Sequence, residues 1–164
     1  MPARNRRRRD VSGGPHEAAG SGRVLALDLG TKRIGVALSD PSGIIASPLE
    51  TIVAAGERRA VEQIVALCRR HGVARAVVGW PRNMDGSRGP AAQRAEAFAE
   101  RLRRALGIPV VLWDERLSTA AAERALIEAG ARRDERRETR DRLAAALFLQ
   151  AYLDAQRPPG PHPA

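Results

Sequence analysis

Two short apolar runs joined by four residues constrain the fold of this chain most strongly. The first run is "RVLALDL" at 23–29, the second is "IGVALSD" at 34–40, and "GTKR" lies between them. Apolar runs of this length predict strands, and a connection this short predicts that the two strands pair antiparallel. The folded part of the chain is therefore expected to begin with a hairpin.

Three more strands and several helices are expected after the hairpin. The strands are predicted at 43–52, 74–80 and 108–115. The spacing of apolar residues predicts helices at 56–72 and 91–107, a short helix capped by Ser118 or Thr119, and a long helix at 138–154. This order predicts an α/β fold with a five-stranded mixed sheet, antiparallel at first and parallel later, and helices on both faces.

The chain of 164 residues suits one domain with flanking segments. Residues 1–22 contain "RNRRRRD" followed by Gly, Pro, Ser and Ala, which predicts a disordered basic arm. Residues 157–164 are rich in proline and predict a disordered tail. The folded domain is thus expected at 23–156.

Charge and cysteine content narrow the class of protein. The formal net charge is +9, and Lys32 is the only lysine, so arginine carries nearly all of the positive charge. Arginine grips phosphate with two donors, which favours a nucleic-acid partner, although codon bias is an alternative source of the arginine. Cys68 is the only cysteine, and no apolar run approaches the roughly 18 residues of a membrane span. These features favour the cytoplasm and no membrane partner.

Asp28 ends the first apolar run, where a carboxylate is unexpected. Strand alternation places it on the face of Val24 and Ala26, opposite Leu25 and Leu27. A charge on a covered face costs several kcal/mol unless it is paired or bound to a metal ion. A salt bridge to arginine or a cap on the following turn would explain it as well as a functional site would.

Further acids occur at the end of the fifth predicted strand and in the last helix. Asp114 and Glu115 point to opposite faces of the strand, at the carboxyl end where sites form in parallel sheets. Asp141 lies at the edge of the apolar face of the helix, next to Ala144 and Ala145. Acids on three elements without a Cys or His cluster suggest Mg²⁺ or Mn²⁺, with paired ions suited to phosphodiester cleavage.

Four blocks of the sequence resemble the YqgF/RuvX family of pre-16S rRNA nucleases, also described as Holliday-junction-resolvase-like proteins. The blocks are "ALDLGTKRIGVALSD", "VVGWPRNMDGSRGPAAQRAEAFAERL", "VVLWDERLSTAAAERAL" and "RDRLAAALFLQAYLD". The resemblance implies a ribonuclease-H-like fold and a metal-dependent nuclease site. It carries the catalytic and metal-binding roles to Asp28, Glu115 and Asp141, with Asp114 as the alternative to Glu115 because a shift of one residue would exchange their faces.

The resemblance and the nearby sequence also suggest substrate contacts. The loop after the fourth strand is expected to border the site, although its "MDGS" could be a plain turn. The basic residues closest in sequence to the acids are the best candidates, although ordinary surface solvation would also explain each of them. The proposed substrate-binding residues are Gly30, Lys32, Arg33, Arg82, Asn83, Asp85, Gly86, Ser87, Arg88 and Arg116.

Several functions compete at this point. The sequence does not separate pre-16S rRNA from four-way DNA junctions as the substrate, because both are read through shape and backbone charge. We place maturation of the 5′ end of pre-16S rRNA, in ribosomal precursor particles, first and resolution of four-way DNA junctions second. A non-catalytic nucleic-acid-binding module is a further alternative. "DLGT" also resembles a phosphate loop of ATP-using kinases, but those need a second domain. A junction resolvase would be a homodimer, whereas an RNA-trimming nuclease could be a monomer.

Overall fold

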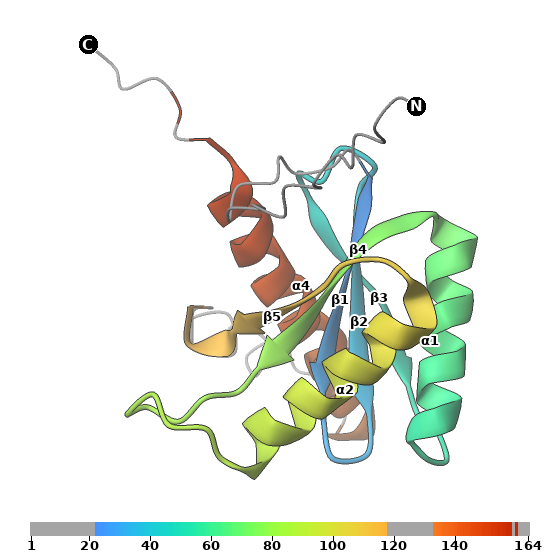
Figure 1. Ribbon diagram of the computed structural model, residues 1–164, viewed down its shortest axis with the longest axis vertical. Coiled ribbons are helices and arrows are strands. Elements are labelled where there is room, and N and C mark those ends of the chain that lie inside the picture. The colour runs from blue at the N-terminus through green and yellow to red at the C-terminus, as the bar shows by residue number, and fades with distance from the viewer. Residues whose placement is uncertain (1–21, 118–132, 159, 161–164) are drawn as a thin grey trace, which may run out of the picture.

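The computed structural model describes residues 22–117, 133–158 and 160 (Figure 1). Five strands form one sheet in the order β3-β2-β1-β4-β5. The strands are β1 (Arg23–Leu29), β2 (Ile34–Ser39), β3 (Ala46–Ile52), β4 (Val73–Trp80) and β5 (Val110–Asp114). The helices are α1 (Glu57–His71), α2 (Pro90–Leu106), the 3-10 helix η1 (Glu115–Leu117) and α4 (Arg133–Gln156).

The strand pairing confirms the predicted mixed sheet. β1 pairs antiparallel with β2, and β2 pairs antiparallel with β3. β1 pairs parallel with β4, and β4 pairs parallel with β5. The carboxyl ends of β1, β4 and β5 therefore lie at the same edge of the sheet, which is the edge where sites form in sheets of this kind.

Each face of the sheet has its own apolar core, and helices cover both faces (Figure 1). Leu25 and Leu27 of β1 pack with α1 and α2, where Ile64 and Leu102 are fully buried. Val24 and Ala26 pack on the other face, against α4. The alternation predicted from the sequence thus assigns the face of Asp28 to α4.

The predicted strand boundaries differ from the structure by up to three residues, and two of the differences have a local cause. The third strand begins at Ala46 rather than at residue 43, because the carboxylate of Asp40 accepts hydrogen bonds from the backbone N–H groups of Ile44 (2.7 Å) and Ile45 (2.8 Å). These bonds hold the two residues in a loop. The fifth strand ends at Asp114, because Glu115 already begins the 3-10 helix η1.

The helices agree with the prediction where they are described. α1 and α2 end before Gly72 and Gly107, which adopt the left-handed conformation typical of helix ends. α4 starts at Arg133, earlier than predicted. The short helix predicted after Ser118 or Thr119 falls outside the described residues, as do residues 1–21 of the arm predicted at 1–22 and residues 159 and 161–164 of the predicted tail. None of the described helices is long and apolar enough to span a membrane.

Candidate functional site

Asp28 lies between two glycines of the neighbouring strands. It pairs with Gly35 of β2, and the register of β1 with β4 brings Gly79 to its other side, one position beyond the pair of Leu27 and Val78. Asp28 is half-buried. Because glycine carries no side chain, atoms of other elements can approach the sheet closely on both sides of Asp28, on its α4 face.

Gly35 brings α4 into direct contact with the sheet. A Cβ atom at this position would overlap the backbone carbonyl group of Asp141 and lie 3.0 Å from the nitrogen of Arg142. Only a glycine admits the helix backbone this closely. The residue beside Asp28 in the sheet therefore determines how near Asp141 comes to β1.

Gly79 allows the side chain of Glu115 to approach the sheet, as Gly35 does for the backbone of Asp141. A Cβ atom here would overlap the Oε1 atom of Glu115 and lie 3.3 Å from the ring of Phe148. Phe148 belongs to the apolar core under α4, so the side chain of Glu115 lies on the α4 face. The three acids that the resemblance selects are thus arranged on three separate elements around the two glycines.

The donor types of this arrangement fit Mg²⁺ or Mn²⁺, since all three side chains offer hard oxygen atoms. In the part of the chain that the structure describes, no three Asp, Glu, His or Cys side chains form a group that could hold a metal ion. Asp28, Glu115 and Asp141 thus lie at the same edge of the sheet, but in this structure their side chains are not grouped closely enough to bind one ion.

Asp114 makes a different set of contacts. Its carboxylate accepts hydrogen bonds from Nε (3.0 Å) and Nη2 (2.6 Å) of Arg116 and from the Arg116 backbone N–H (3.0 Å). Arg82 lies 4.0 Å away. Asp114 pairs with Trp80 of β4, whose side chain packs on the α1 and α2 face. Its carboxylate is therefore engaged in positioning arginines, while Glu115 points to the α4 face.

The hydrogen bonds from Arg116, the largest cause, hold the pKa of Asp114 below its ordinary value of 3.8. Since this pKa is lowered in the folded state, the stabilisation by Asp114 is present above about pH 4 and is lost as the pH falls through the folded-state pKa. We expect Asp114→Asn to lower the melting temperature at pH 6 and to differ less from the unsubstituted protein at pH 3. A difference that persists unchanged at pH 3 in thermal unfolding would contradict this assignment.

The loop at 81–89 is held by its own hydrogen bonds. Asn83 donates its backbone N–H to the Ser87 carbonyl (3.0 Å) and its side-chain amide to the Ser87 hydroxyl (2.9 Å). Asp85 accepts the Ser87 backbone N–H (2.8 Å), and hydrogen bonds with Ser87 are the main cause of its lowered pKa. Gly86 has a positive φ of 85°, as a tight turn requires. "MDGS" therefore forms an ordered turn.

Two arginines brace this loop. Arg82 donates a hydrogen bond to the carbonyl of Gly86, and its guanidinium lies 4.7 Å from the centre of the Trp80 ring. Arg116 donates to the carbonyl of Asn83 (3.5 Å). Arg82 and Arg116 thus hold the loop and η1 together, and both also contact the carboxylate of Asp114.

The other predicted substrate residues lie elsewhere. Arg88 forms an ion pair with Glu96 of α2 (3.1 Å), at the start of that helix. Gly30, Lys32 and Arg33 belong to the β1–β2 turn, where the Gly30 N–H donates to the Arg33 carbonyl (2.7 Å). The structure therefore divides the predicted contacts between two loops rather than gathering them in one.

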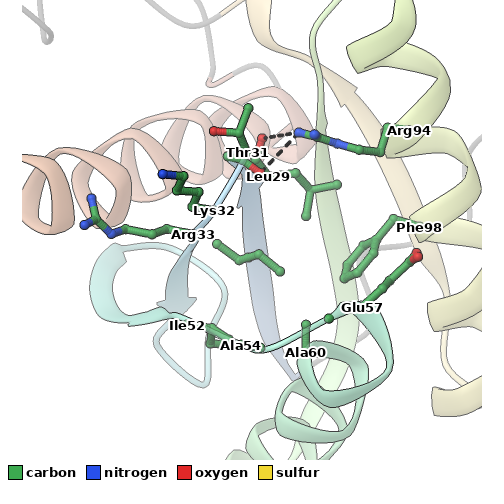
Figure 2. A pocket seen from close by; sticks show the side chains of 13 residues that line it. Leu29, Thr31, Lys32, Arg33, Ile52, Ala54, Glu57, Ala60, Arg94 and Phe98 are labelled. Carbon is green, nitrogen blue, oxygen red and sulfur yellow. Dashed lines mark hydrogen bonds between the residues drawn. The ribbon is translucent and has the colours of Figure 1, made fainter.

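The sequence analysis missed two residues beside the β1–β2 turn. Arg94 of α2 donates to the carbonyls of Gly30 (3.2 Å) and Leu29 (3.5 Å), and Phe98 lies one helical turn further along (Figure 2). Both line a pocket next to the turn. Their spacing of four residues on one helix face was a signal for a shared surface, but nothing local in the sequence links that face to the turn.

The chain is similar to known proteins over most of its length. The family model "RuvX: Holliday junction resolvase" matches residues 22–155. A protein of Geobacillus kaustophilus named "Putative pre-16S rRNA nuclease" is 52% identical over 137 residues, which cover 82% of this chain and 99% of that protein. A protein of Pelotomaculum thermopropionicum with the same name is 54% identical over 138 residues, covering 84% and 90% of the two chains.

A solved structure has the same fold. RuvC of T. thermophilus, in complex with a Holliday junction substrate, matches with a TM-score of 0.55 over 82% of this chain and 96% of that one. The two sequences are 16% identical, so the likeness concerns the fold alone. It confirms the predicted ribonuclease-H-like fold.

Proposed function

The chain belongs to the RuvX family, and on this premise we propose that it is a nuclease that hydrolyses phosphodiester bonds in structured nucleic acid. The observation that carries the proposal is the close approach of three acid-bearing elements around Gly35 and Gly79. The glycines allow the backbone of Asp141 and the side chain of Glu115 to come close to the two strands that flank Asp28.

Asp28, Glu115 and Asp141 are the proposed ligands of Mg²⁺ or Mn²⁺. When bound, two such ions supply an activated water and stabilise the leaving oxygen. The chain itself orients the substrate: the arginines around Asp114 attract the phosphates on one side of the acids, and the β1–β2 turn carries Lys32 and Arg33 on the other. The formal charge of +9 favours association with a polyanion.

The proposed substrate is the 5′ region of pre-16S rRNA, met in ribosomal precursor particles in the cytoplasm. The names of the two relatives support this choice. The description of the family model keeps the four-way DNA junction as the second candidate. A trimming nuclease can act as a monomer, whereas a resolvase has to cut two strands and needs a homodimer.

Incubation with labelled substrates separates the two candidates. We expect the protein, with Mg²⁺ or Mn²⁺, to cut labelled pre-16S rRNA within its 5′ region and to leave a labelled four-way junction largely intact. The mass in solution is measured by light scattering on the same sample, and a monomer is expected. Cleavage confined to the junction by a dimer would reverse the order of the two substrates.

A further inference from the structure

A pocket of about 240 Å³ lies beside the β1–β2 turn, on the side of the sheet that α1 and α2 cover (Figure 2). The turn forms one wall, the end of β3 and the start of α1 form the floor, and α2 contributes Arg94 and Phe98. The proposed catalytic acids lie on the opposite face. Gly30, Lys32 and Arg33 of its wall are already proposed to contact the substrate, but its apolar interior has no role in the functions proposed above.

The interior of the pocket is apolar and its rim is charged. Leu29, Ile34, Ile52, Ala60 and Phe98 supply aliphatic and aromatic surface. Lys32 and Arg33 lie on one side of this surface, and Glu57 lies on the other (Figure 2). A flat apolar ligand that carries an anion at one end matches this distribution.

Arg94 and Glu57 give the pocket fixed walls. The two hydrogen bonds from Arg94 Nη2 tie α2 to the carbonyls of Leu29 and Gly30. Glu57 is held by Arg101 of α2 at 3.0 Å. Since Arg101 balances the charge of Glu57, the net charge at the pocket comes from Lys32, Arg33 and Arg94, and it attracts the anion of a ligand.

We propose that this pocket receives one unpaired nucleobase of the substrate strand, with the attached phosphate against Lys32 and Arg33. The inference rests on the proposed nuclease function and specifies its substrate. The volume is below the roughly 300 Å³ at which pockets for drug-sized ligands begin, so it suits a single base. Bases are commonly held by apolar and aromatic side chains in proteins that bind single strands.

The position of the turn connects the pocket with the acids. Asp28 and Leu29 are adjacent in β1, and they point to opposite faces of the sheet. A strand that crosses the turn at this edge can therefore place a phosphate beside Asp28 and a nearby base beside Leu29. A base in a duplex remains stacked and paired, so the pocket selects strands that are unpaired next to the cut.

Binding of abasic RNA tests this proposal without cleavage. Short single-stranded RNAs, each with one abasic residue at a different position, are titrated by fluorescence anisotropy in EDTA. We expect one position to weaken binding by roughly 5- to 150-fold, which corresponds to the loss of one base contact. The other positions are expected to have small effects.

A filled pocket provides the matched comparison. Ala60→Leu should bind the intact RNA more weakly and lose the position dependence, whereas Ala66→Leu, at an exposed position of the same helix, should retain it. Melting temperatures establish whether both variants fold. If Ala60→Leu does not fold, Ala54→Leu takes its place in the comparison.

Two results would overturn the proposal. One is equal binding of all the abasic RNAs by the unsubstituted protein. If adenosine monophosphate also binds tightly in that case, the pocket is assigned to a free nucleotide instead. The other is an unchanged profile in a folded Ala60→Leu variant. Since this assay requires no cutting, a protein that shows the profile but cuts nothing would refute the nuclease function and leave the pocket assignment intact.

Discussion

Asp28→Asn is expected to lower the cleavage rate by on the order of 10³-fold while the protein stays folded. The two side chains have the same shape, but the amide lacks the negative charge that would hold a divalent cation at the centre of the site. The rate is measured under single-turnover conditions with the labelled RNA. The melting temperature should change by only a few degrees, because no packing is altered.

Metal binding gives a second measure of the same substitution. Calorimetric titration with Mn²⁺ should show binding to the unsubstituted protein and clearly weaker binding to Asp28→Asn. Asp154→Asn is the matched control, since Asp154 is an exposed aspartate on α4 far along the helix from Asp141. It should cut within about twofold of the normal rate. Normal cleavage and normal Mn²⁺ binding by Asp28→Asn would remove Asp28 from the proposed site.

The sequence predicted the sheet and the faces of its strands because these depend on local patterns. Alternation along β1 was sufficient to separate Leu25 and Leu27 from Val24 and Ala26, and the structure packs the two pairs in different cores. Alternation along the fifth strand favoured Glu115 over Asp114, because Glu115 shares the face of Val111 and Trp113, which pack in the core under α4. The contact of Glu115 with Gly79 and the bonds of Asp114 to Arg116 agree with that choice of face. The catalytic role of Glu115 stays a prediction.

Features that depend on distant contacts were not predictable. The ion pair of Arg88 with Glu96 of α2 could not be read from the sequence, and the substrate contact of Arg88 stays a prediction. The start of β3 was misplaced because the acceptor for Ile44 and Ile45 is a carboxylate in the preceding turn. The pocket forms where the β1–β2 turn, the end of β3, α1 and α2 meet, and no local sequence pattern predicts that these elements pack together. The importance of Gly35 likewise appears only when α4 is placed over it.

Alanine substitutions at Gly35 and Gly79, the two glycines beside Asp28, are also expected to have large effects. Neither has a positive φ, so alanine introduces no backbone strain at either position. At Gly35 the new Cβ would overlap backbone atoms of Asp141, which cannot move unless α4 moves. At Gly79 it would overlap the end of the Glu115 side chain, which can rotate away. The same substitution should therefore produce two different defects.

We expect Gly35→Ala to destabilise the protein by about 2–3 kcal/mol, because overpacking of this kind outweighs the roughly 0.4–1 kcal/mol gained from a stiffer unfolded chain. Gly79→Ala should cost about 1 kcal/mol or less. It should nevertheless lower the cleavage rate by on the order of 10²-fold, because a displacement of about 1 Å in a catalytic group has an effect of this size.

Urea unfolding and single-turnover cleavage, measured on both variants, provide the comparison. Each variant serves as the control for the other, since both add one methyl group to a strand beside Asp28. A stable Gly79→Ala protein that cuts at the normal rate would show that the position of Glu115 does not matter for the reaction. A stable Gly35→Ala protein would show that α4 can retreat from the sheet at little cost, and the close approach of Asp141 would then no longer support the proposed site.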